Sequence, residues 1–332
     1  MPHIVLPDET EQSTTAPKLS VVIPVFNEEA VIAEANLRVL AACSKLSLPF
    51  EVIYVDDGSR DQTWTMLLAL AQRFPEVIVV RLSRNFGHQL ALTAGLEICR
   101  GARILMLDAD LQDPPELIVE MMSIMDQGAD VVFGKRIERK GESAFKLFTA
   151  RWFYRVLNRL TDIEIPHEVG DFRLVSRQVL EALKTLPEQH RFVRGMVSWL
   201  GFEQVALPYV RQQRFAGETK YPFRKMMRLA VDAITGFSII PLRASLWLAG
   251  AGFLTAMVVT AYALISWLFY DAVRGWASLA VVIALFASAQ LLCLGILGEY
   301  VGRMFIELKA RPLVIVRSIE RRPTEDTGNT GT

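Results

Sequence analysis

Two long apolar segments near the carboxyl end of the chain constrain its fold more than any other feature. Residues 242–270 contain one charged side chain, Arg243, and residues 277–297 contain none. A helix needs about 20 apolar residues to cross the hydrocarbon core of a bilayer, and each segment exceeds that length. We therefore predict two transmembrane helices, at about 242–270 and 277–302, joined into a hairpin by a short turn.

The charges around this hairpin predict its orientation. Basic side chains cluster on its two outer flanks, whereas the turn at residues 271–276 carries one aspartate and one arginine. Because segments rich in Lys and Arg stay on the cytoplasmic side, we expect both termini and the amino-terminal domain in the cytoplasm, with the hairpin in the inner (plasma) membrane.

Two further segments have the pattern of amphipathic helices. Residues 221–241, with Arg224, Lys225 and Arg228, directly precede the first apolar segment, and we predict that they lie at the membrane interface. Residues 144–161 mix aromatic and basic side chains. They are either an ordinary surface helix or a second interfacial one.

Residues 19–220 show a different pattern, in which short apolar runs alternate with amphipathic helices. The apolar runs predict strands at about 19–25, 50–55, 77–82, 102–107 and 130–134, and residues 203–210 predict one or two further short strands. This alternation indicates an α/β fold with a doubly wound, mostly parallel sheet, which binds its ligands at the carboxyl ends of its strands. Four polar loops follow predicted strands and are expected to meet there, at residues 24–28, 56–59, 83–87 and 108–113.

The two ends of the chain are polar. Residues 1–18 are predicted to be a disordered tail without a signal peptide. Residues 307–332 are predicted to hold a late strand, at 312–316, and a polar tail. That strand is expected to pair with another sheet edge, with a neighbouring subunit as one candidate.

Composition disfavours several classes of protein. The 332 residues include 36 basic and 36 acidic side chains, so the basic excess of a general nucleic-acid binder is missing. Cys43, Cys99 and Cys293 have no paired spacing, which indicates neither a disulfide framework nor a zinc site. The chain has no GxGxxG motif and no Walker A loop, so a dinucleotide dehydrogenase or a P-loop NTPase finds no support.

The loop at residues 108–113 carries the strongest candidate chemistry. Asp108 and Asp110 are two residues apart, so extended backbone points them to the same side. Two carboxylates at such a short separation raise each other's pKa unless a cation neutralises them. Carboxylate oxygens suit Mg²⁺ or Mn²⁺, which keep open positions for substrate phosphates. A solvated acidic turn is the other interpretation of the same two residues.

Six motifs together resemble the family-2 glycosyltransferases of the GT-A fold. Within them they resemble the polyprenyl-phosphate sugar synthases, such as dolichol-phosphate mannose synthase and the bacterial GtrB-type enzymes. The motifs are VVIPVFNEE (21–29), VDDGS (55–59), SRNFG (83–87), DADLQDPP (108–115), GDFRL (170–174) and LGEYVGR (297–303). The resemblance implies a cell-envelope enzyme that transfers a sugar, with inversion, from a nucleotide-sugar such as a UDP-hexose to polyprenyl phosphate. It also implies a homo-tetramer.

The resemblance implies roles for matching residues. Pro24, Glu28 and Asp57 would line the nucleotide pocket, and Asp56 can also accept a hydrogen bond from the ribose or base. Asp108, Asp110 and Gln112 would organise the metal ion and the donor diphosphate. Asp171 lies where the family has its catalytic carboxylate.

The role of Asp171 has alternatives. A phosphate monoester has a second pKa of about 6 and is mostly a dianionic nucleophile at pH 7, so little proton abstraction is needed. Asp171 can instead orient a sugar hydroxyl or a basic residue, or form a structural ion pair.

The acceptor phosphate needs cations, because two anionic substrates must meet. Arg136 ends the fifth predicted strand and is the first candidate. Arg139, Lys140, Arg151 and Lys220 follow, and a solvated loop explains Arg139 and Lys140 equally well.

Three rival functions are weighed. A transferase to a lipid alcohol (ceramide or diacylglycerol) would need Asp171 as a true general base. A processive polysaccharide synthase would carry a Gln-x-x-Arg-Trp motif, which RQQRF at 211–215 does not match. A non-catalytic membrane scaffold would not need its acidic residues intact. The sequence does not specify the sugar, the prenyl length or the metal.

Overall fold

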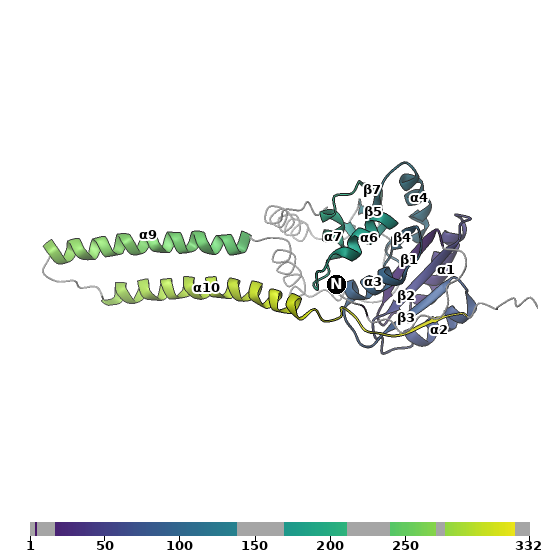
Figure 1. Ribbon diagram of the computed structural model, residues 1–332, viewed down its shortest axis with the longest axis horizontal. Coiled ribbons are helices and arrows are strands. Elements are labelled where there is room, and N and C mark those ends of the chain that lie inside the picture. Colours follow the sequence, from purple (N-terminus) through teal and green to yellow (C-terminus); the bar gives the residue numbers. More distant parts are fainter. Residues whose placement is uncertain (1–3, 5–16, 138–168, 211–239, 270–275, 323–332) are drawn as a thin grey trace, which may run out of the picture. The chain divides into compact units, whose positions relative to one another are not determined.

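The computed structural model describes residues 4, 17–137, 169–210, 240–269 and 276–322, and these form two compact units. The first unit is the α/β domain (Figure 1). Its elements are β1 (Leu19–Val25), α1 (Ile32–Ser44), β2 (Phe50–Asp56), α2 (Thr63–Arg73), β3 (Val77–Leu82), α3 (His88–Ile98), β4 (Arg103–Met106), η1 (Pro115–Leu117), α4 (Ile118–Asp126), β5 (Val131–Arg136), β6 (Val169–Ser176), α6 (Arg177–Thr185), α7 (Val193–Trp199), β7 (Gln204–Tyr209) and β8 (Val316–Arg321).

The strands form one mixed sheet in the order β7-β5-β6-β4-β1-β2-β3-β8. The central strands β4, β1, β2 and β3 are parallel, and β5 is parallel to β7. β6 runs antiparallel to both β4 and β5, and β8 runs antiparallel to β3. The chain leaves β1 toward β2 and β3, then returns to β4 on the other side of β1. This reversal is the switch point at which such sheets bind ligands.

The centre of the domain forms because its strands are apolar on both faces. All residues of β1 are buried, as expected for a central parallel strand. Val21 and Ile23 belong to a core cluster that also includes side chains of α1, α2 and α4. The opposite face of β1 and β2 contacts α3. Helices therefore cover both faces of the sheet and leave its edges to the loops.

The antiparallel direction of β6 decides what lies at the carboxyl edge of the sheet. Met106, the last residue of β4, is paired with Arg173 of β6. Asp171 therefore lies two residues beyond the end of β4, beside the loop that continues toward Asp108. β5 and β7 end at the same edge, where Arg136 is opposite Tyr209. This edge collects the polar loops that the sequence predicts to meet.

Two strands differ from prediction. β6 is not predicted as a strand, because its polar Asp171 and Arg173 are as buried as its apolar Phe172 and Leu174, so no alternating pattern marks it. The prediction of a late strand at 312–316 is wrong in position. The strand is β8, Val316–Arg321, and it pairs with β3 of its own chain. The other predicted strands are confirmed to within two residues at each end.

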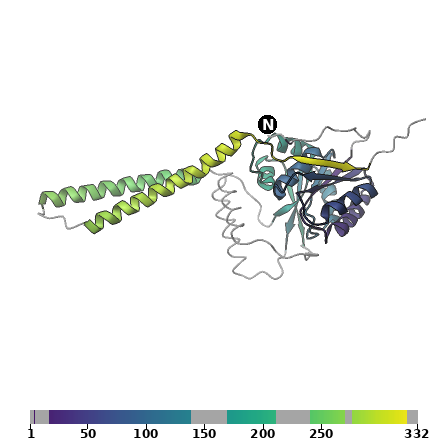
Figure 2. The same ribbon diagram turned by 90° about the horizontal axis from the view of Figure 1, so that it is seen from below.

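The second unit contains α9 (Ile240–Phe269) and α10 (Trp276–Lys309), which lie side by side (Figures 1 and 2). Phe286 packs directly against Gly252, where an added Cβ would lie 3.0 Å from the ring. Leu242–Tyr262 and Leu285–Lys309 are long and apolar enough to cross a membrane. The segments 144–161 and 221–239, predicted as amphipathic helices, lie outside the described residues.

Candidate active site

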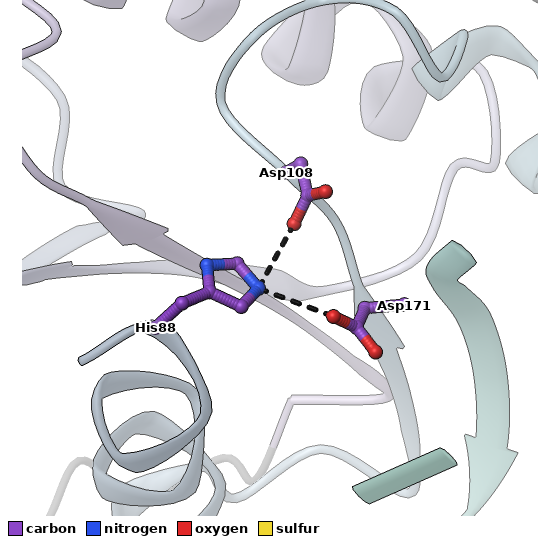
Figure 3. Close-up of side chains that lie close together, drawn as sticks. All are labelled: His88, Asp108 and Asp171. Atoms are coloured by element: carbon purple, nitrogen blue, oxygen red, sulfur yellow. Dashed lines mark ion pairs between the residues drawn. The ribbon is translucent and has the colours of Figure 1, made fainter. Parts of the chain in front are cut away.

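Three side chains from different elements converge at the carboxyl edge of the sheet (Figure 3). His88 is the first residue of α3, Asp108 follows β4, and Asp171 lies near the start of β6. The His88 Nε2 atom is 3.3 Å from Asp108 Oδ1 and 3.2 Å from Asp171 Oδ2. One imidazole thus joins the loop after β4 to β6.

Asp171 is almost fully buried and its two oxygens are engaged. Arg194 Nε donates to Oδ1 at 2.9 Å, and Gln89 Nε2 donates to Oδ2 at 2.8 Å. The side-chain oxygen of Gln89, Oε1, in turn accepts from the backbone N–H of Val193 at 3.0 Å, at the start of α7. Burial raises the pKa of Asp171, but Arg194, His88 and Arg173 outweigh it and hold that pKa well below its usual range. Asp171 is therefore an ionised carboxylate and a poor proton acceptor.

His88 is the accessible member of this group. Its side chain is 42% exposed, whereas that of Asp171 is 6% exposed. Burial lowers the pKa of His88, but hydrogen bonds and charges from Asp108 and Asp171 outweigh it and raise that pKa well above its usual value. The imidazolium partly neutralises the two carboxylates.

The loop after β4 fits a divalent cation. Asp108 Oδ1 is buried and lies 3.3 Å from the His88 imidazole. Asp110 Oδ1 accepts from the backbone N–H of Gln112 at 3.2 Å, across Leu111, whose φ of 57° is in the left-handed region. Hard oxygen atoms of this kind suit Mg²⁺ or Mn²⁺. Among the His, Cys, Asp and Glu side chains of the described residues, His88, Asp108 and Asp171 offer ligand atoms within 4.8 Å of one another, a group that does not include Asp110.

The predicted donor-binding residues lie in β1 or in the loops that follow β1 and β2. Asp57 accepts backbone N–H bonds from Phe86 at 2.7 Å and Gly87 at 2.9 Å, so it orders the loop after β3. Burial raises the pKa of Asp57, only partly offset by those two bonds. Glu28 is half-buried, with its backbone N–H donating to Thr63 Oγ1 at 2.8 Å. Pro24 is buried within β1.

Asp56 differs from its neighbour. It is fully buried, and its Oδ1 accepts from the backbone N–H of Ser59 at 3.0 Å. Its Oδ2 faces Arg81 Nε at 3.6 Å. These contacts hold the turn after β2, and the carboxylate is turned into the fold.

Arg136 is already engaged. Its Nε donates to the Tyr209 hydroxyl at 3.1 Å, and one Nη lies 3.3 and 3.4 Å from the two oxygens of Asp113. Tyr209 also donates to Asp113. The other predicted acceptor cations, Arg139, Lys140, Arg151 and Lys220, lie outside the described residues.

Five residues of this site have no role in the sequence prediction, namely His88, Gln89, Asp113, Arg194 and Tyr209. His88 and Gln89 carry a usable signal, because they directly follow a polar loop at a strand end. Asp113 closes the motif at 108–115. Arg194 carries none, since only the unpredicted strand β6 brings its segment to this edge. Tyr209 ends a predicted strand, β7, whose pairing with β5 the sequence does not predict.

The chain is similar in sequence to known proteins along most of its length. The family model described as Glycosyl transferase family 2 matches residues 20–184. An uncharacterized glycosyltransferase, YkcC, of Bacillus subtilis is 47% identical over 90% of this chain and 93% of its own. A prophage bactoprenol glucosyl transferase homolog of Escherichia coli is 39% identical over 92% of this chain and 100% of its own. Among solved structures, Staphylococcus aureus TarS residues 1–349 with UDP-GlcNAc is 22% identical to this chain. The match covers 66% of this chain and 67% of that one, with a TM-score of 0.44.

The relatives extend over nearly the whole chain, and the sheet is the mostly parallel one that the motifs imply. The predicted fold class, a GT-A domain followed by two apolar helices, is confirmed. With a relative 47% identical along 303 residues, the chain belongs to glycosyl transferase family 2.

Proposed function

We propose that this glycosyltransferase moves a hexose from UDP-hexose to polyprenyl phosphate at the cytoplasmic face of the membrane, with inversion at the anomeric carbon. The observation that carries the proposal is the convergence of Asp108 and Asp171 on His88 at the carboxyl edge of the sheet. Relatives named bactoprenol glucosyl transferase, 39–40% identical to this chain, support a polyprenyl acceptor.

In this proposal Asp108, Asp110 and Gln112 hold Mg²⁺ or Mn²⁺. The buried Asp108 Oδ1, which belongs to the group of possible ligand atoms with His88 and Asp171, is the atom that we expect to bind such an ion. When bound, the ion offsets the negative charge that develops on the leaving diphosphate. Pro24, Glu28 and Asp57 hold the nucleotide, with Asp57 acting mainly through the loop at residues 83–87 that it orders. Asp56 acts only by holding the turn after β2.

The state of Asp171 favours a phosphate acceptor over an alcohol. An alcohol must lose its proton to a general base, which needs a free lone pair and a pKa near the working pH. Asp171 is engaged by Arg194, Gln89 and His88, and its pKa is lowered. A phosphate monoester needs no such base, since it is a dianion at neutral pH. Asp171 then acts by orienting His88 and Arg194.

The two apolar helices would place the lipid. α9 and α10 have the length and composition of membrane spans. With basic residues on the outer flanks of the hairpin, we propose that both termini and the catalytic domain are cytoplasmic. Cysteine-accessibility labelling tests this, since a cytoplasmic position for residues near Asp271 would reverse the topology.

The reaction is tested with purified protein in detergent. A panel of UDP- and GDP-sugars is supplied with Mn²⁺ or EDTA, with polyprenyl phosphate, a lipid alcohol (ceramide or diacylglycerol) or no lipid. The proposal expects labelled sugar in the lipid phase only with polyprenyl phosphate and metal. Sugar on the alcohol would support the alternative transferase, and no nucleoside diphosphate release under any condition would support a non-catalytic scaffold.

A further inference from the structure

A second polar cluster forms around Asp113, at the end of the loop that carries Asp108 and Asp110. Asp113 is 1% exposed and lies against Arg136 of β5 and Tyr209 of β7. Arg136 donates to the Tyr209 hydroxyl, Tyr209 donates to Asp113, and Arg136 ion-pairs with Asp113. These three side chains form a closed ring of interactions, which we call the Asp113 network.

Two glycines make room for this network. An added Cβ at Gly134 would lie 2.8 Å from the Tyr209 ring and 2.7 Å from Phe172. One at Gly170 would lie 2.7 Å from Arg136 Nη2 and 3.6 Å from Asp113 Oδ2. At Gly134 both neighbours are aromatic rings, so the packing there depends on glycine. At Gly170 an added Cβ would require the end of the Arg136 side chain to move.

The network touches both halves of the active site. Asp113 ends the loop that carries Asp108 and Asp110, and that loop contains the left-handed Leu111. A strained backbone of this kind persists only where its surroundings hold it. On the other side, Arg136 packs on Gly170, and the Tyr209 ring packs edge-on against Phe172 at 5.8 Å. Gly170 and Phe172 are the two chain neighbours of Asp171.

We propose that Asp113, Arg136 and Tyr209 are positioning residues that hold the metal-binding loop in register with Asp171 and thereby set the affinity for the divalent cation. This inference rests on the proposed cation site. It gives Arg136 a role in the geometry of the site, in place of the free phosphate-binding role that the sequence favours. Partners behind metal ligands typically change metal affinity by about 10- to 100-fold when they are removed.

The test is Mn²⁺ binding, measured from the free-ion signal in electron paramagnetic resonance with UDP present. Tyr209→Phe keeps the ring against Phe172 and removes the bridging hydroxyl. We expect its Mn²⁺ dissociation constant to rise about tenfold. At saturating Mn²⁺, kcat should return to within about twofold of wild type, with an unchanged KM for polyprenyl phosphate. Asp113→Asn, which keeps the shape and removes the charge, should weaken Mn²⁺ binding at least as much.

Tyr54→Phe is the matched control. Tyr54 is also a buried tyrosine, and its hydroxyl donates to Asn36 at 3.2 Å within β2 and α1, away from the metal loop. The Tyr54→Phe variant should bind Mn²⁺ with the same affinity as wild type. Equal Mn²⁺ affinity in wild type and Tyr209→Phe, or an equal loss in both tyrosine variants, would overturn the network's role. A wild-type protein that binds no Mn²⁺ would instead refute the cation site itself.

Discussion

The Arg194 guanidinium and the Asp171 carboxylate form an ion pair in which Nε lies 2.9 Å from Oδ1. It joins the start of α7 to β6, the strand that the sequence does not predict. Because Gln89 and His88 engage the other oxygen, Asp171 has three partners and no free role as a base. This makes the carboxylate a structural and electrostatic centre of the site.

Asp171→Asn should therefore lower both stability and activity. Removing one partner of a buried pair costs about 3–5 kcal/mol, and Arg173, also buried, loses its counter-charge. We expect the midpoint of thermal unfolding to fall by roughly 6 °C or more at pH 7. Asp126→Asn is the control, because Asp126 is 68% exposed in its pair with Arg103 and that pair should contribute less than about 1 kcal/mol.

The pH dependence of that difference follows from the pKa of Asp171. A carboxylate with a lowered native pKa stabilises the fold above its unfolded pKa of about 4, and the stabilisation is lost as the pH falls further. The difference in unfolding free energy between wild type and Asp171→Asn should be largest at pH 7 and should shrink below about pH 4. A gap that widens as the pH falls would contradict the assigned direction.

Asp57→Ala should weaken donor binding. The substitution leaves the backbone N–H groups of Phe86 and Gly87 without their carboxylate, at about 1–3 kcal/mol each. Without it the loop at residues 83–87 loosens, and we expect the UDP dissociation constant in calorimetry to rise about tenfold. Ser176→Ala removes a helix cap at the opposite edge, where Ser176 accepts from Val179 at 3.3 Å, and should leave UDP binding unchanged. Unaltered UDP affinity in Asp57→Ala would separate Asp57 from the donor site.

Cys43 and Cys99 should resist alkylation in the folded protein. Burial raises the pKa of each thiol to about 12, so roughly one molecule in ten thousand carries the thiolate at pH 8. In a Cys293→Ala background, mass spectrometry should find iodoacetamide on both residues in urea and on neither in native protein. Rapid native labelling at pH 8 would show that these positions open.

The sequence predicts the parallel part of this fold well, for a physical reason. Strands such as β1 and β4 are buried on both faces and read as continuous apolar runs, and the polar loops directly follow them. β6 escapes detection, because it carries Asp171 and Arg173 in buried positions that are compensated by residues far along the chain. Without β6, nothing in the sequence brings Arg194 to the edge where Asp171 lies.

The candidate site also has one part that the sequence predicts and another that it does not. Motif position predicts that Asp57, Asp108 and Asp171 gather at one edge, but it does not tell which carboxylate faces the substrate. Asp56 and Asp57 are adjacent and chemically identical, yet Asp56 is turned toward Arg81 and Ser59. Arg136 is a plausible phosphate ligand by position, and only the contacts of Asp113 and Tyr209 reveal its engagement. Such pairings depend on tertiary packing.

The central claim is that sugar is transferred to a lipid phosphate, and ³¹P magnetic resonance tests it most directly. Purified protein is incubated with UDP-hexose, polyprenyl phosphate and Mg²⁺, and the phosphorus signals are followed. The account predicts that the monoester resonance of the lipid gives way to a phosphodiester resonance as UDP appears in equal amount. If UDP forms while the monoester resonance stays unchanged, the acceptor is another group and the account is wrong.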